Sequence, residues 1–104
     1  MSSQGLPLKE IGDLLRREYH AQRVILFGSQ ARGDAGPDSD IDLLVSAPTE
    51  ERFYDRLASV RRLLRSVASG LPISPIVLTP SEIDARLRRG DQFVQEILAT
   101  GVEL

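Results

Sequence analysis

Hydrophobic and polar residues follow one another in the first part of the chain with the spacing of an amphipathic helix. Between Leu8 and Tyr19 the apolar residues recur every three or four positions, with charged residues between them, which predicts a helix there. A short apolar run then precedes Gly28 and consists of Val24, Ile25, Leu26 and Phe27. These residues favour a buried strand, and the glycine predicts a tight turn at its end.

The middle of the chain predicts a second strand and the longest helix. Apolar residues surround one carboxylate in Ile41–Val45, which indicates a strand that Pro48 ends. Thr49 is a residue type that caps helices, so we expect the helix to start there and to end at Gly70. One apolar stripe along this helix is expected to pack in the core, namely Phe53, Leu57, Val60, Leu64 and Val67.

The last third of the chain predicts one more strand and two short helices. Ile73–Leu78 is strand-like, and Pro75 within it favours an edge position or a bulge because proline cannot donate to a ladder. A helix is expected from about Pro80 to Arg88. Further helical turns follow before Gly101, after which a short final strand is expected.

The order of these elements describes one small domain. The order fits an α/β layer in which helices pack on a few strands, and it reads helix, strand, strand, helix, strand, helix, helix. The composition, with 41% hydrophobic and 27% charged residues, is that of a soluble globular protein. No linker or internal repeat is visible, so residues 1–104 are expected to form a single domain.

Several classes of protein are excluded by what the chain lacks. No apolar run approaches the roughly 20 residues of a membrane span, and the first residues do not look like a signal peptide, so we expect a cytoplasmic protein. Without cysteine there are no disulfides and no thiolate metal sites, and a single histidine, His20, argues against zinc. The net charge of −2 gives no overall attraction to nucleic acid.

Positive charge is nevertheless concentrated in one segment. Of the 13 basic residues 12 are arginine, and five lie around the predicted long helix, namely Arg52, Arg56, Arg61, Arg62 and Arg65. They form either a solvated helix face or a surface that contacts phosphate or RNA.

The segment between the first two strands carries candidate chemistry. Gly28 and Ser29 stand where a strand turns into a short helix, and unpaired N–H groups at such a turn favour an anion. Asp40 and Asp42 are two residues apart at the second strand, so both carboxylates point to the same face. Because they would repel each other, a divalent cation is expected between them, and oxygen ligands favour Mg²⁺ or Mn²⁺.

The spacing of these residues resembles the signature of the DNA polymerase β nucleotidyltransferase superfamily, namely Gly28-Ser29, ten further residues and then Asp40-Ile41-Asp42. The flanking residues are similar to those of its smallest members, the minimal nucleotidyltransferases that are usually encoded beside a HEPN-domain partner. The resemblance implies the polymerase β-type fold, a mixed sheet of few strands with helices packed on it. It also implies a two-metal transfer of a nucleoside monophosphate from a nucleoside triphosphate, such as ATP, to a hydroxyl.

On this resemblance, Gly28 and Ser29 would hold the terminal phosphates, and Asp40 and Asp42 would be the catalytic metal ligands. Arg32 would brace the phosphates or the turn from Asp38 to Asp40, or would be an ordinary surface arginine.

The sequence departs from this family at one position. Active members carry a third carboxylate on the next strand, where this chain has Ser74, and no acidic residue lies between Asp55 and Glu82. A serine hydroxyl is a poor ligand for Mg²⁺, so activation of the attacking hydroxyl should suffer more than nucleotide binding. Glu82, Asp84 or a partner protein would have to supply the missing group.

Two functions are therefore open. The first is an Mg²⁺-dependent nucleotidyltransferase that modifies a protein or RNA hydroxyl, as the antitoxin of a HEPN-domain partner. The second is a catalytically impaired module that keeps the fold and neutralises or scaffolds a partner by contact, and a homo-oligomer is compatible with either.

Overall fold

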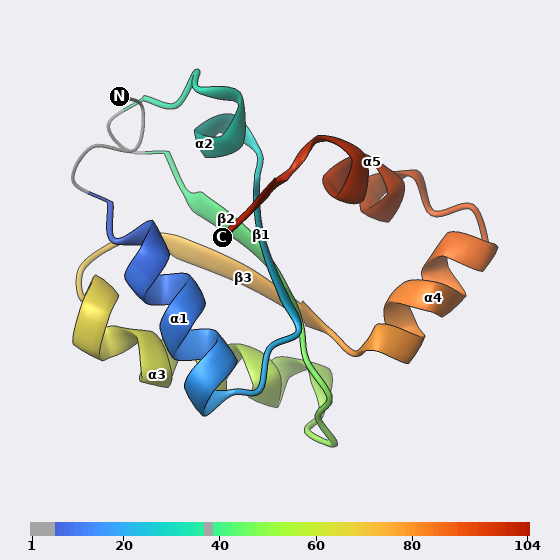
Figure 1. Ribbon diagram of the computed structural model, residues 1–104, viewed down its shortest axis with the longest axis horizontal. Helices are drawn as coiled ribbons and strands as arrows, with labels where there is room; N and C mark the ends of the chain where they lie inside the picture. Colours follow the sequence, from blue (N-terminus) through green and yellow to red (C-terminus); the bar gives the residue numbers. More distant parts are fainter. Residues whose placement is uncertain (1–5, 37–38) are drawn as a thin grey trace.

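We describe the protein from a computed structural model, which defines residues 6–36 and 39–104. The elements follow the predicted order (Figure 1). The helices are α1 (Leu8–Glu18), α2 (Ser29–Arg32), α3 (Phe53–Ala68), α4 (Pro80–Arg88) and α5 (Gln92–Thr100). The strands are β1 (Arg23–Phe27), β2 (Ile41–Ser46), β3 (Ile73–Leu78) and β4 (Val102–Glu103).

The four strands form one mixed sheet in the order β3-β2-β1-β4. The central pair, β1 and β2, is antiparallel, and β4 pairs with β1 in the same way. β3 lies parallel to β2, as expected of two strands that are joined through a crossover helix, here α3. The expected small α/β fold with a mixed sheet is confirmed.

Helices cover both faces of the sheet (Figure 1). α1 and α3 pack on one face, where Ile11, Leu43 and Val60 are fully buried. α4 and α5 pack on the other face, around Leu44, Val94 and Ile97. Because side chains alternate along a strand, the even-numbered residues of β2 face α4 and α5. The Asp42 carboxylate of β2 therefore lies on the α4–α5 side of the sheet.

Most predicted boundaries agree with the structure. The first helix ends one residue before Tyr19, and Pro75 lies in the edge strand β3, as the missing N–H group indicated. α4 begins with a capping box in which the Thr79 side chain accepts from the Glu82 amide. None of the helices in the described ranges is long and apolar enough to cross a membrane.

The start of the long helix was predicted wrongly. α3 begins at Phe53, whereas the Thr49 hydroxyl accepts the Glu51 N–H at 3.1 Å and closes a local turn. Threonine serves such turns and helix caps equally well, so the sequence alone does not separate them. The core stripe is also rotated, because Phe53 is 45% exposed while Arg56 lies beside Val60 on the buried face.

Candidate functional site

The predicted site residues meet where β1 ends and β2 begins. Phe27, the last residue of β1, is the register partner of Asp42 on β2. Gly28 and Ser29 follow directly and lead into α2, while Asp40 precedes β2 by one residue. The antiparallel pairing of β1 and β2 thus brings the Gly-Ser turn and the two carboxylates to one corner of the sheet.

Gly28 owes its place in this corner to the absence of a side chain. Its backbone has φ +75° and ψ −155°, a combination that is essentially restricted to glycine. A Cβ atom added here would lie 2.4 Å from Oδ2 of Asp42, closer than real contacts allow. The Gly28 carbonyl accepts the N–H groups of Ala31 and Arg32, both at 3.1 Å, and so starts α2. The turn is therefore shaped around the Asp42 carboxylate.

The electrostatics of the Asp42 carboxylate agree with the expected repulsion. Partial burial raises the pKa of Asp42, and the nearby charge of Asp40 raises it further. The guanidinium of Arg32 opposes both effects and lowers this pKa. A cation between the two side chains would relieve the repulsion that they impose on each other.

Ser74 lies beside this pair, at the position where a third carboxylate was expected. It is the register partner of Asp42 in the parallel β2–β3 pair, and both side chains face the same side of the sheet. Its hydroxyl donates to Oδ2 of Asp40 at 3.4 Å, a long hydrogen bond. The neutral hydroxyl therefore touches the acidic pair without adding a charge to it.

Neither acidic residue of α4 replaces the missing carboxylate. β3 runs parallel to β2, so α4 begins at the opposite end of the sheet from Asp42. There Glu82 receives two hydrogen bonds from Arg56, at 2.6 and 3.1 Å, and Asp84 pairs with Arg88. The hypothesis that Glu82 or Asp84 reaches into the site is wrong.

Arg32 lies at the corner with its guanidinium exposed. It pairs with Asp34 at 3.2 Å, and 65% of its side chain is accessible. The proposed brace to Asp38 falls outside the described residues. Because the weak exposed pair with Asp34 is easily exchanged, Arg32 can turn toward an anion bound near Gly28.

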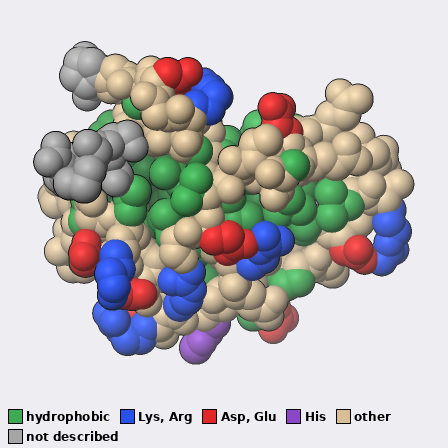
Figure 2. Space-filling model, turned by 45° about the horizontal axis from the view of Figure 1, so that its top comes forward, with side chains coloured by type: hydrophobic (Ala, Val, Ile, Leu, Met, Phe, Trp, Pro, Cys, Tyr) green, Lys and Arg blue, Asp and Glu red, His purple; other side chains and the backbone are tan. Residues whose placement is uncertain are grey.

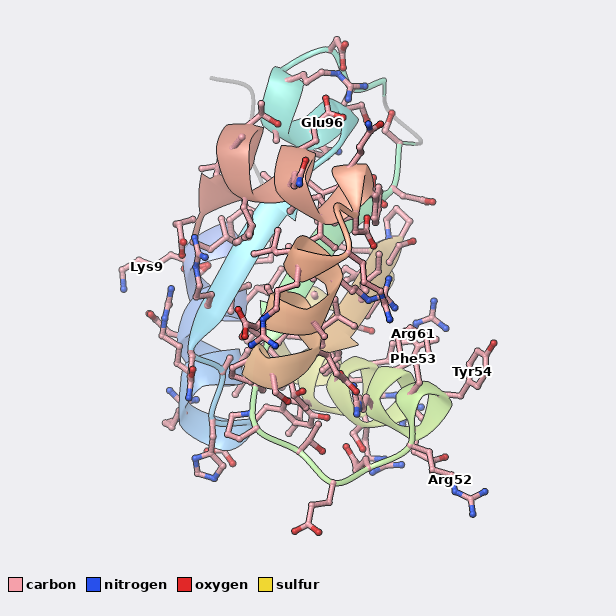
Figure 3. The ribbon with its side chains drawn as sticks, turned by 90° about the vertical axis from the view of Figure 1, so that its right-hand side faces the viewer. Lys9, Arg52, Phe53, Tyr54, Arg61 and Glu96 are labelled. Carbon is pink, nitrogen blue, oxygen red and sulfur yellow. The ribbon has the colours of Figure 1, made fainter. Side chains whose placement is uncertain are left out.

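The arginine-rich segment does not form a single basic surface. Arg56 is only 6% exposed and donates to the backbone carbonyls of Glu51 and Val77 as well as to Glu82. Arg52 and Arg61 project from the exposed side of α3, near Tyr54 (Figure 3). Acidic and basic side chains are interspersed on the face shown in Figure 2. One of the five arginines, Arg56, is thus a structural residue that connects α3 to β3 and α4, and we call it the Arg56 clamp.

The donor set fits one divalent cation better than two. Two carboxylates on one face are a typical protein contribution to an Mg²⁺ site whose other ligands are substrate phosphates and water. Within residues 6–36 and 39–104, no group of three or more acidic, histidine or cysteine side chains is placed to hold a metal. Asp40 and Asp42 would hold the first cation, while a second would lack the carboxylate that Ser74 replaces.

A hollow beside the corner was not predicted from the sequence. It lies between α2 and α5, has a volume of about 460 Å³, and is lined by Phe27, Ala31, Arg32, Phe93, Glu96 and Ile97, among others. The spacing of Phe93 and Ile97 indicated only a helix face in the core. Their position opposite α2 depends on long-range packing that has no local signal.

Comparison with known proteins agrees with this geometry. The family described as "Nucleotidyltransferase domain" matches residues 8–99. The chain belongs to this nucleotidyltransferase family. The matched region contains the Gly-Ser turn, the carboxylate pair and α5 except for its last residue, so the elements that build the corner lie within the match.

Two relatives of this nucleotidyltransferase come from Methanocaldococcus jannaschii. "Putative protein adenylyltransferase MJ0141" is 30% identical over 97 residues, which are 92% of this chain and 89% of that protein. "Putative protein adenylyltransferase MJ1305" is 39% identical over 66 residues, which are 61% of this chain. The second match spans only 45% of MJ1305, which is therefore the longer protein.

Proposed function

We propose that this nucleotidyltransferase transfers AMP from ATP to a hydroxyl group of a protein. The observation that carries the proposal is the packing of Gly28 against Asp42, beside Asp40 and Arg32, which places a glycine turn next to an acidic pair. The names of the two relatives support adenylyl transfer and a protein acceptor. The resemblance to minimal nucleotidyltransferases supports a HEPN-domain partner as the acceptor, and a cytoplasmic toxin–antitoxin pair as the setting.

In the reaction, the acceptor oxygen forms a bond to the α-phosphorus, and the bond from that phosphorus to the bridging oxygen breaks. Pyrophosphate leaves, and the proton of the acceptor hydroxyl is released to water. The Gly28 turn and Arg32 bind and orient the phosphates, which is the main contribution that a protein makes to phosphoryl transfer. Mg²⁺, held by Asp40 and Asp42 when bound, supplies charge neutralisation.

The test follows α-labelled ATP into protein in the presence of the candidate partner and Mg²⁺. Asp40→Asn and Asp42→Asn should each abolish transfer, whereas Asp34→Asn, on the neighbouring exposed turn, should leave most of it. Mn²⁺ should substitute for Mg²⁺, and a chelator should stop the reaction. Transfer that survives both site substitutions would reject the assignment, and label in RNA would identify RNA as the acceptor.

A second function is favoured by Ser74, which occupies the place of the third carboxylate. In this alternative the chain binds nucleotide weakly and neutralises or scaffolds its partner by contact. Binding to the partner would then be unaffected by Asp42→Asn and would need neither ATP nor Mg²⁺. A complex that forms only with both ligands present would exclude the alternative.

A further inference from the structure

The hollow between α2 and α5 shares residues with the phosphate-binding corner. Gly28 and Arg32 line it, and so does Phe27, the register partner of Asp42. Its volume of about 460 Å³ lies within the range of small-molecule sites, roughly 300–1,000 Å³. A ligand whose phosphates lie at the corner can therefore extend into this hollow without crossing another element.

Two phenylalanines give the hollow an aromatic wall. The rings of Phe27 and Phe93 meet edge to face, with centroids 5.8 Å apart and planes at 85°. This contact fixes the Phe93 ring, yet 54% of the residue remains exposed. α5 is anchored at its start, where the Asp91 side chain accepts the Val94 N–H at 3.1 Å and pairs with Arg86. The exposed ring is thus held in place and available for stacking.

Glu96 adds one polar group to this wall. Its side chain extends from α5 on the side of α2 (Figure 3), and within the described ranges no ion pair holds it. An ionised carboxylate only accepts hydrogen bonds, so it repels phosphates and favours hydroxyl or amino groups. The hollow therefore combines a stacking surface with one acceptor, next to a turn that suits phosphate.

We infer that this hollow binds the nucleoside part of the triphosphate substrate. Phe93 stacks on the base, and Glu96 accepts hydrogen bonds from ribose hydroxyls or from the exocyclic amino group of the base. The inference rests on the proposed function, because it assumes that the triphosphate occupies the corner. The inference goes beyond the proposed function because it assigns base and sugar recognition to α5, which carries neither the proposed metal ligands nor the proposed phosphate-binding residues.

The test compares two ligands by calorimetric titration with Mg²⁺, namely ATP and inorganic tripolyphosphate. Both carry the phosphate chain, but only ATP carries the nucleoside. Phe93→Ala should weaken ATP binding at least about fivefold, the lower end for loss of one stacked base, and leave tripolyphosphate binding unchanged. Glu96→Gln should weaken ATP binding by a smaller factor. Phe53→Ala is the matched control, because Phe53 is a similarly exposed phenylalanine at the start of α3, and it should change neither affinity.

The possible outcomes separate the inference from the function on which it rests. If tripolyphosphate binds and ATP binding is unaffected in both α5 variants, the nucleoside lies elsewhere and the inference is wrong. If Phe93→Ala weakens the binding of both ligands equally, the ring supports the fold and the inference is also wrong. Glu96→Gln checks this result, because it removes no apolar contact. If the unmodified protein binds neither ligand, the proposed function fails together with the inference.

Discussion

Gly28 lies so close to the Asp42 carboxylate that no side chain fits between them. Any Cβ at position 28 would lie 2.4 Å from Oδ2 of Asp42. The tight turn and the Asp42 carboxylate are therefore coupled, and any side chain at position 28 would have to displace that carboxylate.

We predict that Gly28→Ala weakens Mg²⁺-ATP binding more than tenfold and lowers the free energy of unfolding by about 2–4 kcal/mol, from strain and crowding together. Gly33→Ala is the control. Gly33 has φ +81° at the end of α2, but nothing lies within 4 Å of its added Cβ. Its cost should be about 1–2 kcal/mol, with little loss of ATP affinity. Urea unfolding and calorimetry measure both quantities, and equal effects of the two variants would contradict the coupling.

Ser74→Asp should restore the missing ligand. The new carboxylate would lie beside Asp42 in register and close to Asp40, so we expect a gain in Mg²⁺-dependent adenylyl transfer of at least tenfold. Without Mg²⁺ the variant should be less stable, because three carboxylates would repel one another. Ser74→Asn matches the size without the charge and should give no gain. Equal activity of both variants would show that charge at this position is not what limits the reaction.

Removing one charge of the acidic pair should abolish activity and increase the stability of the fold. Burial and Asp40 raise the pKa of Asp42 above its ordinary value, so ionised Asp42 disfavours the folded state at neutral pH. Asp42→Asn should therefore increase the free energy of unfolding by about 0.5–1 kcal/mol at pH 7 while abolishing transfer. The gain should vanish at a pH below the ordinary pKa of aspartate, where the wild-type side chain is neutral in both states. A loss of stability at pH 7 would contradict the assigned repulsion.

The Arg56–Glu82 pair should make stability depend on acid. The hydrogen bonds that Arg56 donates to Glu82 hold the pKa of this carboxyl at about 2, below its ordinary value of 4.5. This contribution is complete above pH 4.5 and is lost as the pH falls toward 2. Because the Glu82 side chain is 41% exposed, we expect about 1–2 kcal/mol rather than the full value of the shift. Glu82→Gln should remove that amount at pH 7 and almost nothing near pH 2, measured by urea unfolding.

Asp84→Asn provides the comparison on the same helix. Asp84 pairs with Arg88 while both side chains remain more than half exposed, so its loss should cost no more than about 0.5 kcal/mol at any pH. If both variants showed the same pH dependence, the Arg56 clamp would not be its source.

Local sequence patterns predicted much of the site. The two-residue spacing of Asp40 and Asp42 was sufficient to place both carboxylates on one face, and the apolar runs on either side located the two strands that meet there. The roles of these residues as metal and phosphate ligands stay predictions. Ser74 was predicted to stand at the position of the third carboxylate, and its register with Asp42 agrees.

Features that depend on distant contacts were not predicted. Arg56 looked like part of a solvated helix face, since its partners, the Val77 carbonyl and Glu82, lie more than 20 residues away along the chain. The hollow beside Phe93 has the same cause, because Phe27 and Phe93 meet only after α5 has folded back over the sheet. Periodicity reports which face of an element is apolar and does not report what covers it.

The edge strand β3 also limits how a partner can complete the site. The Pro72 carbonyl accepts from Ile41 in β2, and the Leu78 carbonyl accepts from Ala47 just after it. The alternate residues of β3 therefore turn their backbone groups outward, namely Ile73, Pro75 and Val77. Ile73 donates to Leu71, the Val77 carbonyl accepts from Arg56, and Pro75 has no N–H to offer. A partner strand would therefore find an interrupted row of backbone groups on this border, as protected edges in soluble proteins show. We therefore expect a protein that supplies a third carboxylate to insert a side chain from a loop or helix instead of extending the sheet.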